Sequence, residues 1–246
     1  MIRPILITFL GITLGSNAAC QKLFKKEQAV SPSAASPAMY TVEGSYPDGK
    51  GPYAGKVEIS PGDGIYQLKW NAGTQSQGVG LVLGHLLALG LGDPAKPGYG
   101  VGVYTVGENG GLKGRWAMEG NTALGAETWA PGPRTVVQLG PGSATAVRVG
   151  GTYTVVGKNP GGKGGYHGTL TITPDGELFH LQWSVGTTYT GIGVQDKNVL
   201  VVGWGNLHQP GYGMVAYTVQ ANGILEGKWT TFGGRALGTE TATPKK

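Results

Sequence analysis

The sequence has one cysteine, few charged residues and no apolar run long enough to cross a membrane as a helix. Charged residues make up 13% of the chain, about half of the ~25% that is typical of soluble domains. This scarcity argues against coiled coils, helical bundles and charge-rich disordered chains. The lone cysteine excludes an internal disulfide. Glycine and proline are abundant instead, with 47 and 15 residues among 246, and together with 6 Trp and 11 Tyr they predict an all-β protein with many turns.

Positive charge is in slight excess, with a formal net charge of +5. Lys and Arg stand singly or in short groups such as Lys25-Lys26 and Lys245-Lys246. No basic stripe is dense enough to neutralise many phosphates. The charge pattern therefore argues against nucleic-acid binding.

Residues 1–19 have the order of a secretory signal peptide, in which one basic residue precedes the apolar run Ile5 to Leu14 and small residues follow. This run is too short to span a bilayer. The segment Ser16-Asn17-Ala18-Ala19-Cys20 resembles a bacterial lipobox, although Asn17 stands where an aliphatic residue is usual. The resemblance implies an exported lipoprotein anchored through Cys20. The alternative is an ordinary signal-peptidase site beside a stray cysteine.

Residues 20–39 are rich in Ser, Ala and Pro and poor in apolar residues, which predicts a flexible tether behind the anchor. Gln21 beside the cysteine resembles the signal that permits transport to the outer membrane of Gram-negative bacteria. The predicted location is therefore the outer membrane, on either its periplasmic or its surface face, with the lipid anchor as the membrane contact.

An internal duplication is the strongest signal in the sequence. Residues 40–128 align with residues 153–241 at a constant offset of 113 without a gap, and about forty of roughly ninety positions are identical. Equal loop lengths predict that both copies fold alike. We expect two domains with a linker and a short tail, at residues 40–130, 131–152, 153–242 and 243–246.

Each copy contains short segments in which apolar and polar residues alternate with a period of two, as in half-buried strands. In one of them Leu68 and Trp70 share a face and Lys69 lies on the other. Such segments predict about eight strands per copy, which in the first copy begin near Tyr40, Tyr53, Ile65, Gln75, Leu86, Tyr99, Gly111 and Ala123. The apolar stretch from Val79 to Gly92 is predicted to be two strands and a turn rather than a helix.

Eight sequential strands can close into an up-and-down barrel that leaves no exposed edge. The predicted fold is therefore all-β, with two tandem small antiparallel β-barrels and flattened sandwiches as the alternative. Gly-x-Trp strands in such barrels resemble lipocalins and avidins in architecture only, because the motif lies here on the seventh strand, so no ligand residue carries over. The chain also resembles short exported bacterial proteins described as hypothetical or fibronectin-binding, for which we identify no binding or catalytic motif. The segments that carry this second resemblance are Tyr153 to Gly157, Asn159 to Gly161, Leu178 to Trp183 and Leu200 to Gly205.

Four tryptophans lie on the apolar faces of their strands at matched positions of the two copies, namely Trp70, Trp116, Trp183 and Trp229. We expect them to fill the cores, because an eight-stranded barrel has an interior only just wide enough for side chains. The alternative is that they line a pocket for a small apolar ligand. Four further aromatic residues are candidate binding residues, Trp129 and Trp204 because they are not duplicated and Tyr99 and Tyr212 because they end the longest loops.

No catalytic or metal site is predicted, and no cofactor is expected. None of the four histidines is duplicated, and paired cysteines are absent. Glu127 and Glu240 are the only acids present in both copies, without a repeated acid partner for general acid–base chemistry. We interpret each as the ion-pair partner of a cation on the preceding strand, Arg115 for Glu127 and Lys228 for Glu240.

These observations support two functions from different classes, with an enzyme of unknown type as the third. The first is a non-enzymatic envelope lipoprotein whose two β domains bind a macromolecular partner with avidity. The alternative is a lipocalin-like carrier of a small apolar ligand. The interior volume separates them, because a packed interior below ~100 Å³ favours the partner and an open one near ~300 Å³ favours the carrier.

Overall fold

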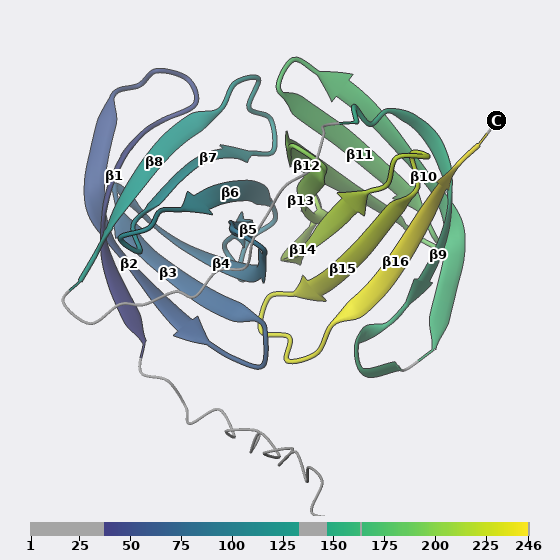
Figure 1. Cartoon of the computed structure of the whole chain (residues 1–246), viewed down its shortest axis with the longest axis horizontal. Helices are drawn as coiled ribbons and strands as arrows, with labels where there is room; N and C mark the ends of the chain where they lie inside the picture. Colours follow the sequence, from purple (N-terminus) through teal and green to yellow (C-terminus); the bar gives the residue numbers. More distant parts are fainter. Residues whose placement is uncertain (1–36, 133–146, 163, 246) are drawn as a thin grey trace, which may run out of the picture. The chain divides into compact units, whose positions relative to one another are not determined.

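The computed structural model describes residues 37–132, 147–162 and 164–245. Within these ranges the chain forms two closed antiparallel barrels of eight strands each (Figure 1). The predicted fold class is confirmed, and the sandwich alternative is wrong. The predicted signal peptide, Cys20 and most of the predicted tether lie outside the described residues, as do residues 133–146 of the predicted linker.

Barrel 1, purple to teal in Figure 1, is an up-and-down barrel. Each strand pairs with its neighbours in the sequence, and β1 closes the barrel by pairing with β8. The strands are β1 (Ala38–Ser45), β2 (Pro52–Pro61), β3 (Tyr66–Ala72), β4 (Thr74–Leu83), β5 (Leu86–Gly92), β6 (Gly100–Val106), β7 (Leu112–Met118) and β8 (Gly125–Pro131).

Barrel 2, green to yellow in Figure 1, repeats this topology, and its first strand β9 pairs with both β10 and β16. A 3₁₀ helix, η1 (Pro160–Gly162), follows β9. The strands are β9 (Gly151–Lys158), β10 (Gly165–Asp175), β11 (Leu178–Ser184), β12 (Thr188–Asp196), β13 (Val199–Asn206), β14 (Gln209–Val219), β15 (Leu225–Thr231) and β16 (Gly238–Pro244).

The strand positions follow from the alternation in the sequence. All eight strands of barrel 1 begin within two residues of the predicted positions. In β3, Leu68 and Trp70 are buried while Lys69 is exposed. Two predicted boundaries differ, because Ala38 and Met39 of the predicted tether pair with β2, and Thr243 and Pro244 of the predicted tail pair with β9.

The stretch from Val79 to Gly92 forms the second half of β4 and all of β5, as predicted. The turn between these strands contains Gly84 with a φ of 58°. Lys197 occupies the matching turn of barrel 2 with a φ of 51° and is the one non-glycine residue with positive φ in the described part of the chain. A left-handed residue is therefore required at this turn in both copies.

Each barrel has its own apolar core. Barrel 1 packs Val57, Leu68, Leu89 and Leu112 together, and barrel 2 packs Val155, Leu170, Leu200 and Leu225. These side chains come from alternate positions of their strands, because successive residues of a strand face opposite sides of the sheet.

A third apolar cluster joins the two barrels and explains why β5 has no polar face. All seven residues of β5 are buried. Leu87 and Leu89 belong to the core of barrel 1, whereas Leu86 and Ala88 pack in a cluster that also contains Met214 of barrel 2. A strand buried on both faces has an unbroken apolar sequence.

Tyr99 and Tyr212 take equivalent positions in this interface between the barrels, with exposed fractions of 1% and 2%. A Cβ atom at Gly205 would lie 2.8 Å from Cδ1 of Tyr99, and one at Gly92 would lie 2.6 Å from Cδ1 of Tyr212. Each ring therefore packs over a glycine of the other barrel. The prediction that these two tyrosines contact a binding partner is therefore wrong, because both are buried between the barrels.

Candidate functional site

A buried glutamate lies inside barrel 1. Glu127 on β8 is 7% exposed. Its Oε1 accepts a hydrogen bond of 2.5 Å from the Tyr53 hydroxyl, and its Oε2 accepts bonds of 2.6 Å from the Tyr104 hydroxyl and 2.7 Å from Nε1 of Trp129. The carboxylate is thus held by three neutral donors, which compensate for its removal from water.

Barrel 2 repeats this arrangement around Glu240 on β16, which is 5% exposed. Oε2 accepts a bond of 2.9 Å from the Tyr166 hydroxyl. Oε1 accepts bonds from Nε1 of Trp183 at 3.0 Å and from the Tyr217 hydroxyl. In both barrels one oxygen therefore has two donors and the other has one.

The register of the sheet explains this convergence in barrel 1. Five residues on neighbouring strands pair directly in one row, in the order Tyr53, Gly44, Glu127, Gly114 and Tyr104. A Cβ atom at Gly44 would lie 2.5 Å from Cζ of Tyr53, and one at Gly114 would lie 2.2 Å from Cδ1 of Tyr104. Each tyrosine ring thus crosses a glycine to reach the carboxylate, because no side chain stands between them.

The same row exists in barrel 2 as Tyr166, Gly157, Glu240, Gly227 and Tyr217. The tyrosines and glycines of both rows were missed as functional residues from the sequence. The available signal was their identity at all five positions of the two copies. The strand register that places them in one row could not be derived from that identity alone.

The structure corrects the predicted ion pairs of both glutamates. Glu127 lies opposite Gly114, so the side chain of the next residue, Arg115, projects from the other face of β7. Nη1 of Arg115 instead pairs with Oε1 of Glu177 at 2.7 Å. Lys228 lies opposite Thr239 rather than Glu240.

Burial and the carboxylates raise the pKa of the surrounding tyrosines. Removal from water is the first cause of the raised pKa at Tyr104 and Tyr217, followed by the charge of Glu127 and Glu240 respectively. The pKa of Tyr53 and of Tyr166 is raised for the same reasons, again with burial first. All four hydroxyls therefore stay protonated and available as donors at neutral pH.

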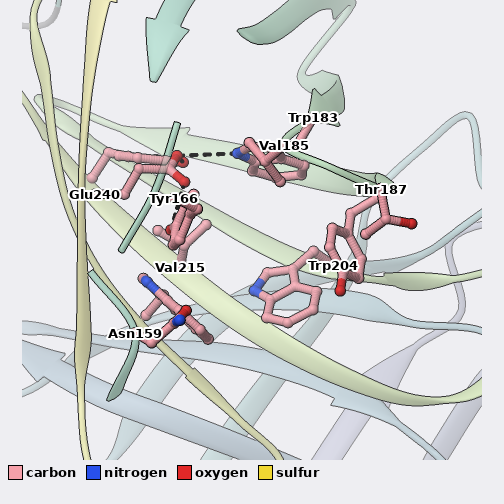
Figure 2. A pocket seen from close by; sticks show the side chains of 11 residues that line it. Asn159, Tyr166, Trp183, Val185, Thr187, Trp204, Val215 and Glu240 are labelled. Atoms are coloured by element: carbon pink, nitrogen blue, oxygen red, sulfur yellow. Dashed lines mark hydrogen bonds between the residues drawn. The ribbon is translucent and has the colours of Figure 1, made fainter. Parts of the chain in front are cut away.

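Glu240 lines a cavity of about 280 Å³ inside barrel 2 (Figure 2). The cavity meets the apolar core at Trp183, Val215 and Tyr217 and reaches solvent at the exposed Thr187. The full lining comprises Asn159, Tyr166, Trp183, Val185, Thr187, Tyr189, Trp204, Val215, Tyr217, Trp229 and Glu240.

Barrel 1 contains the equivalent cavity, with a volume of about 330 Å³ and Glu127 in its lining. Every residue that lines the cavity of barrel 2, except Val215, has its repeat counterpart in the lining of the barrel 1 cavity. Three counterparts change the chemistry, because Trp204 is replaced by Leu91, Tyr189 by Ser76 and Asn159 by Tyr46. The chain thus builds one type of site twice, with different walls.

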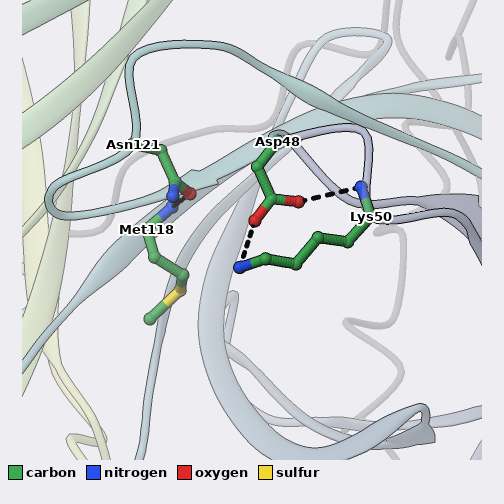
Figure 3. Close-up of polar contacts among 4 residues, drawn as sticks. All are labelled: Asp48, Lys50, Met118 and Asn121. Carbon is green, nitrogen blue, oxygen red and sulfur yellow. Dashed lines mark hydrogen bonds and ion pairs between the residues drawn. The ribbon is translucent and has the colours of Figure 1, made fainter.

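Short turns with local hydrogen bonds border the cavity of barrel 1. Tyr46 and Met118 line it. The turn after Tyr46 is closed by Asp48, which pairs with Nζ of Lys50 at 2.5 Å and accepts the backbone N–H of Lys50 at 3.1 Å (Figure 3). The backbone N–H of Met118 donates to Oδ1 of Asn121 at 2.8 Å. These contacts lie in the turns that follow the two lining residues.

The four duplicated tryptophans serve both predicted roles. Trp70 and Trp116 line the cavity of barrel 1, and Trp183 and Trp229 line that of barrel 2. Trp70 and Trp183 are also members of the apolar cores. Core and pocket are therefore not alternatives here, because the cavity occupies only part of each barrel.

The two tryptophans without a counterpart have separate explanations. Trp129 is 1% exposed inside barrel 1. The prediction that it contacts a binding partner is therefore wrong. Its indole supplies to Glu127 the bond that Trp183 supplies to Glu240, while Trp70, the counterpart of Trp183, packs against it at 5.6 Å and 74°. Trp204 lines the cavity of barrel 2.

Two features are absent from the described residues. No group of three or more His, Cys, Asp or Glu side chains in these ranges could hold a metal ion. No helix in the same ranges is long and apolar enough to cross a membrane.

Two solved structures are distantly similar to this chain. No family model matches the chain, and no curated protein matches its sequence. A DUF3598-family protein of unknown function from Nostoc punctiforme is 12% identical, with 84% of this chain and 95% of that chain covered and a TM-score of 0.29. A protein named "putative outer membrane protein" from Bacteroides fragilis is also 12% identical, with coverages of 87% and 98% and a TM-score of 0.26. We therefore build the proposal on the two cavities alone.

Proposed function

We propose that this chain binds small molecules without transforming them, one in each barrel. The observation that carries the proposal is that one lining is built twice, around cavities of about 280 and 330 Å³. These volumes lie near the ~300 Å³ lower limit of ligand pockets. Aromatic walls with a few convergent polar groups, as around Glu127 and Glu240, are typical of such pockets.

The cavities favour the carrier hypothesis over the macromolecular partner, because both volumes are far above the ~100 Å³ expected of a packed interior. The burial of the aromatic residues that were predicted to contact a partner also favours the carrier hypothesis. Tyr99 and Tyr212 are buried between the barrels, Trp129 is buried within barrel 1, and Trp204 is partly buried in the barrel 2 cavity. None of these four side chains is exposed.

Ligand stoichiometry tests the proposal. Thr74 and Thr187 are exposed counterparts at the two cavities, so Thr74→Trp and Thr187→Trp should each obstruct one of them. We expect calorimetric titration with small neutral aromatics such as indole and 2-naphthol to find two sites per wild-type chain and one per single variant. Full binding by the double variant would place the ligand outside the barrels and contradict the proposal.

We also propose that the protein is exported and lipid-anchored through Cys20 in the outer membrane. Support comes from the sequence of residues 1–20, which ends its signal-like segment at the one cysteine of the chain. Mass spectrometry of protein from envelope membranes should find a diacylated or triacylated mature chain that begins at Cys20. An unmodified chain that begins elsewhere would overturn the anchoring proposal and leave the cavity proposal intact.

A further inference from the structure

We infer that the cavity of barrel 2 selects small organic ammonium cations, an inference that rests on the proposed small-molecule function and names its ligand class. Two properties of the cavity lining carry it. One is a carboxylate that pairs with no cation among the described side chains, and the other is a set of aromatic walls.

Glu240 supplies the negative charge. Its three partners, the hydroxyls of Tyr166 and Tyr217 and the indole N–H of Trp183, are all neutral donors. A carboxylate accepts hydrogen bonds from all three of these groups. Among the side chains that the structure describes, no Lys, Arg or His forms an ion pair with Glu240. From the described residues Oε2 accepts one bond, that of Tyr166, which leaves an acceptor position for an N–H or O–H of a ligand.

Trp204 lies between two other aromatic rings of the cavity wall, Tyr189 and Trp229. Its ring centroid lies 5.3 Å from that of Tyr189 with an interplanar angle of 72°, and 5.9 Å from that of Trp229 with an angle of 71°. Trp229 lies 6.2 Å from Tyr166 at 66°. These three contacts place four aromatic rings next to one another in the lining of the cavity. The face of an aromatic ring is electron-rich and attracts cations, most strongly where water is excluded.

The carboxylate and the rings act on the same ligand. Figure 2 shows the Glu240 carboxylate and the Trp204 indole on different sides of the pocket. Positive charge between them is therefore favoured from both sides, while alkyl groups on the nitrogen find apolar surface. An anionic ligand is disfavoured by the same arrangement, and a neutral one gains only the apolar contacts.

Barrel 1 provides an internal comparison. Its cavity has Leu91 and Ser76 in place of the Trp204 and Tyr189 pair and Tyr46 in place of Asn159, and both Asp93 and Lys96 lie in its lining. Lys96 pairs with Asp93 at 3.3 Å, whereas the counterparts of this pair in barrel 2 are the neutral Gln209 and Asn206. Barrel 1 therefore lacks the Trp204 and Tyr189 rings and has an ammonium group, paired with Asp93, beside its cavity. The selectivity for cations belongs to barrel 2.

Titration with choline and its neutral carbon isostere, 3,3-dimethyl-1-butanol, tests the inference on the intact protein. We expect choline to bind to one site, about tenfold or more tighter than the isostere, and to quench tryptophan fluorescence. Trp204→Leu combined with Tyr189→Ser gives barrel 2 the side chains with which barrel 1 already folds, so this variant should fold and lose the preference for choline. Glu240→Gln should lose it as well. Glu226→Gln removes an exposed charge from β15 of the same barrel and should leave the preference unchanged.

The possible results separate this inference from the proposed function. If the isostere binds as tightly as choline, or if the double variant folds and keeps the preference, the inference is overturned while small-molecule binding stands. If choline does not bind although indole or 2-naphthol does, the inference alone again fails. If none of these compounds binds to either cavity, both proposals fail. Circular dichroism of each variant establishes that any loss of binding occurs in a folded chain.

Discussion

The ring of Tyr217 lies across Gly227, where an added Cβ atom would come 2.6 Å from Cε1 of the ring. Gly227 is the residue directly opposite Glu240 on the neighbouring strand. The absence of a side chain at one position therefore allows a tyrosine from the next strand to hold the buried carboxylate. The same relationship between Tyr104 and Gly114 holds Glu127.

We predict that Gly227→Ala displaces Tyr217 and destabilises barrel 2. Overpacking of this kind typically costs about 1 to 3 kcal/mol, and the loss of a donor to Glu240 adds to it. Urea unfolding measures the change in free energy. Gly107→Ala is the control, since its nearest neighbour would be the side-chain oxygen of Asn109 at 3.3 Å. Equal stability of the two variants would show that the ring does not depend on Gly227.

The indole that donates to the buried glutamate comes from different positions in the two barrels. The same Trp→Phe substitution at counterpart positions should therefore lower the free energy of unfolding by different amounts. Trp183→Phe keeps an aromatic ring but removes a donor to Glu240, and hydrogen bonds to charged groups contribute about 1.5 to 3 kcal/mol. Trp70→Phe, at the counterpart position, removes no donor from Glu127 because Trp129 supplies it. Thermal unfolding should therefore show a clearly larger loss for Trp183→Phe, and a larger loss for Trp70→Phe would contradict the assignment.

Buried tyrosines predict how stability changes with pH. The pKa of Tyr40 is raised by burial to about 12, and the pKa values of Tyr53, Tyr104, Tyr166 and Tyr217 are also raised. A raised pKa in the folded state favours the protonated form, so its stabilisation is complete below the unfolded value of about 10 and is lost as the pH rises through the folded value. Urea midpoints should fall above a pH of about 10, while tyrosinate absorbance shows incomplete ionisation until the chain unfolds. Complete ionisation near that pH in a chain with native circular dichroism would contradict this prediction.

The interface between the barrels predicts a strong effect at Gly203. A Cβ atom there would lie 1.7 Å from the backbone oxygen of Gly100 in the other barrel. Gly203→Val should therefore force the barrels apart and expose their shared apolar cluster, which dye binding and small-angle scattering detect. Glu177→Ala removes only the exposed ion pair with Arg115, which is worth at most about 1 kcal/mol, and should leave the barrels together. An unchanged scattering profile for Gly203→Val would show that this contact does not join them.

Local patterns in the sequence were sufficient to predict the two barrels. Turn glycines and the alternation in segments such as β3 are local properties, and the gapless repeat required both copies to share one fold. Because each pattern extends over a few neighbouring residues, it specifies strands and turns before any long-range contact forms. The unbroken apolar run of β5 also contained the signal of a strand buried on both faces.

The residues that form the site depend on long-range pairing between strands, which local patterns do not specify. Glu127 is paired with Gly44 by barrel closure and with Gly114 by the register of the last hairpin. A shift of one residue in that register would place Arg115 opposite the glutamate and produce the ion pair that the sequence suggested. The cavity is likewise a property of the closed barrel, because its volume depends on how far side chains from all around the barrel extend inward. Alternation shows which residues face inward but does not show how much of the interior they fill.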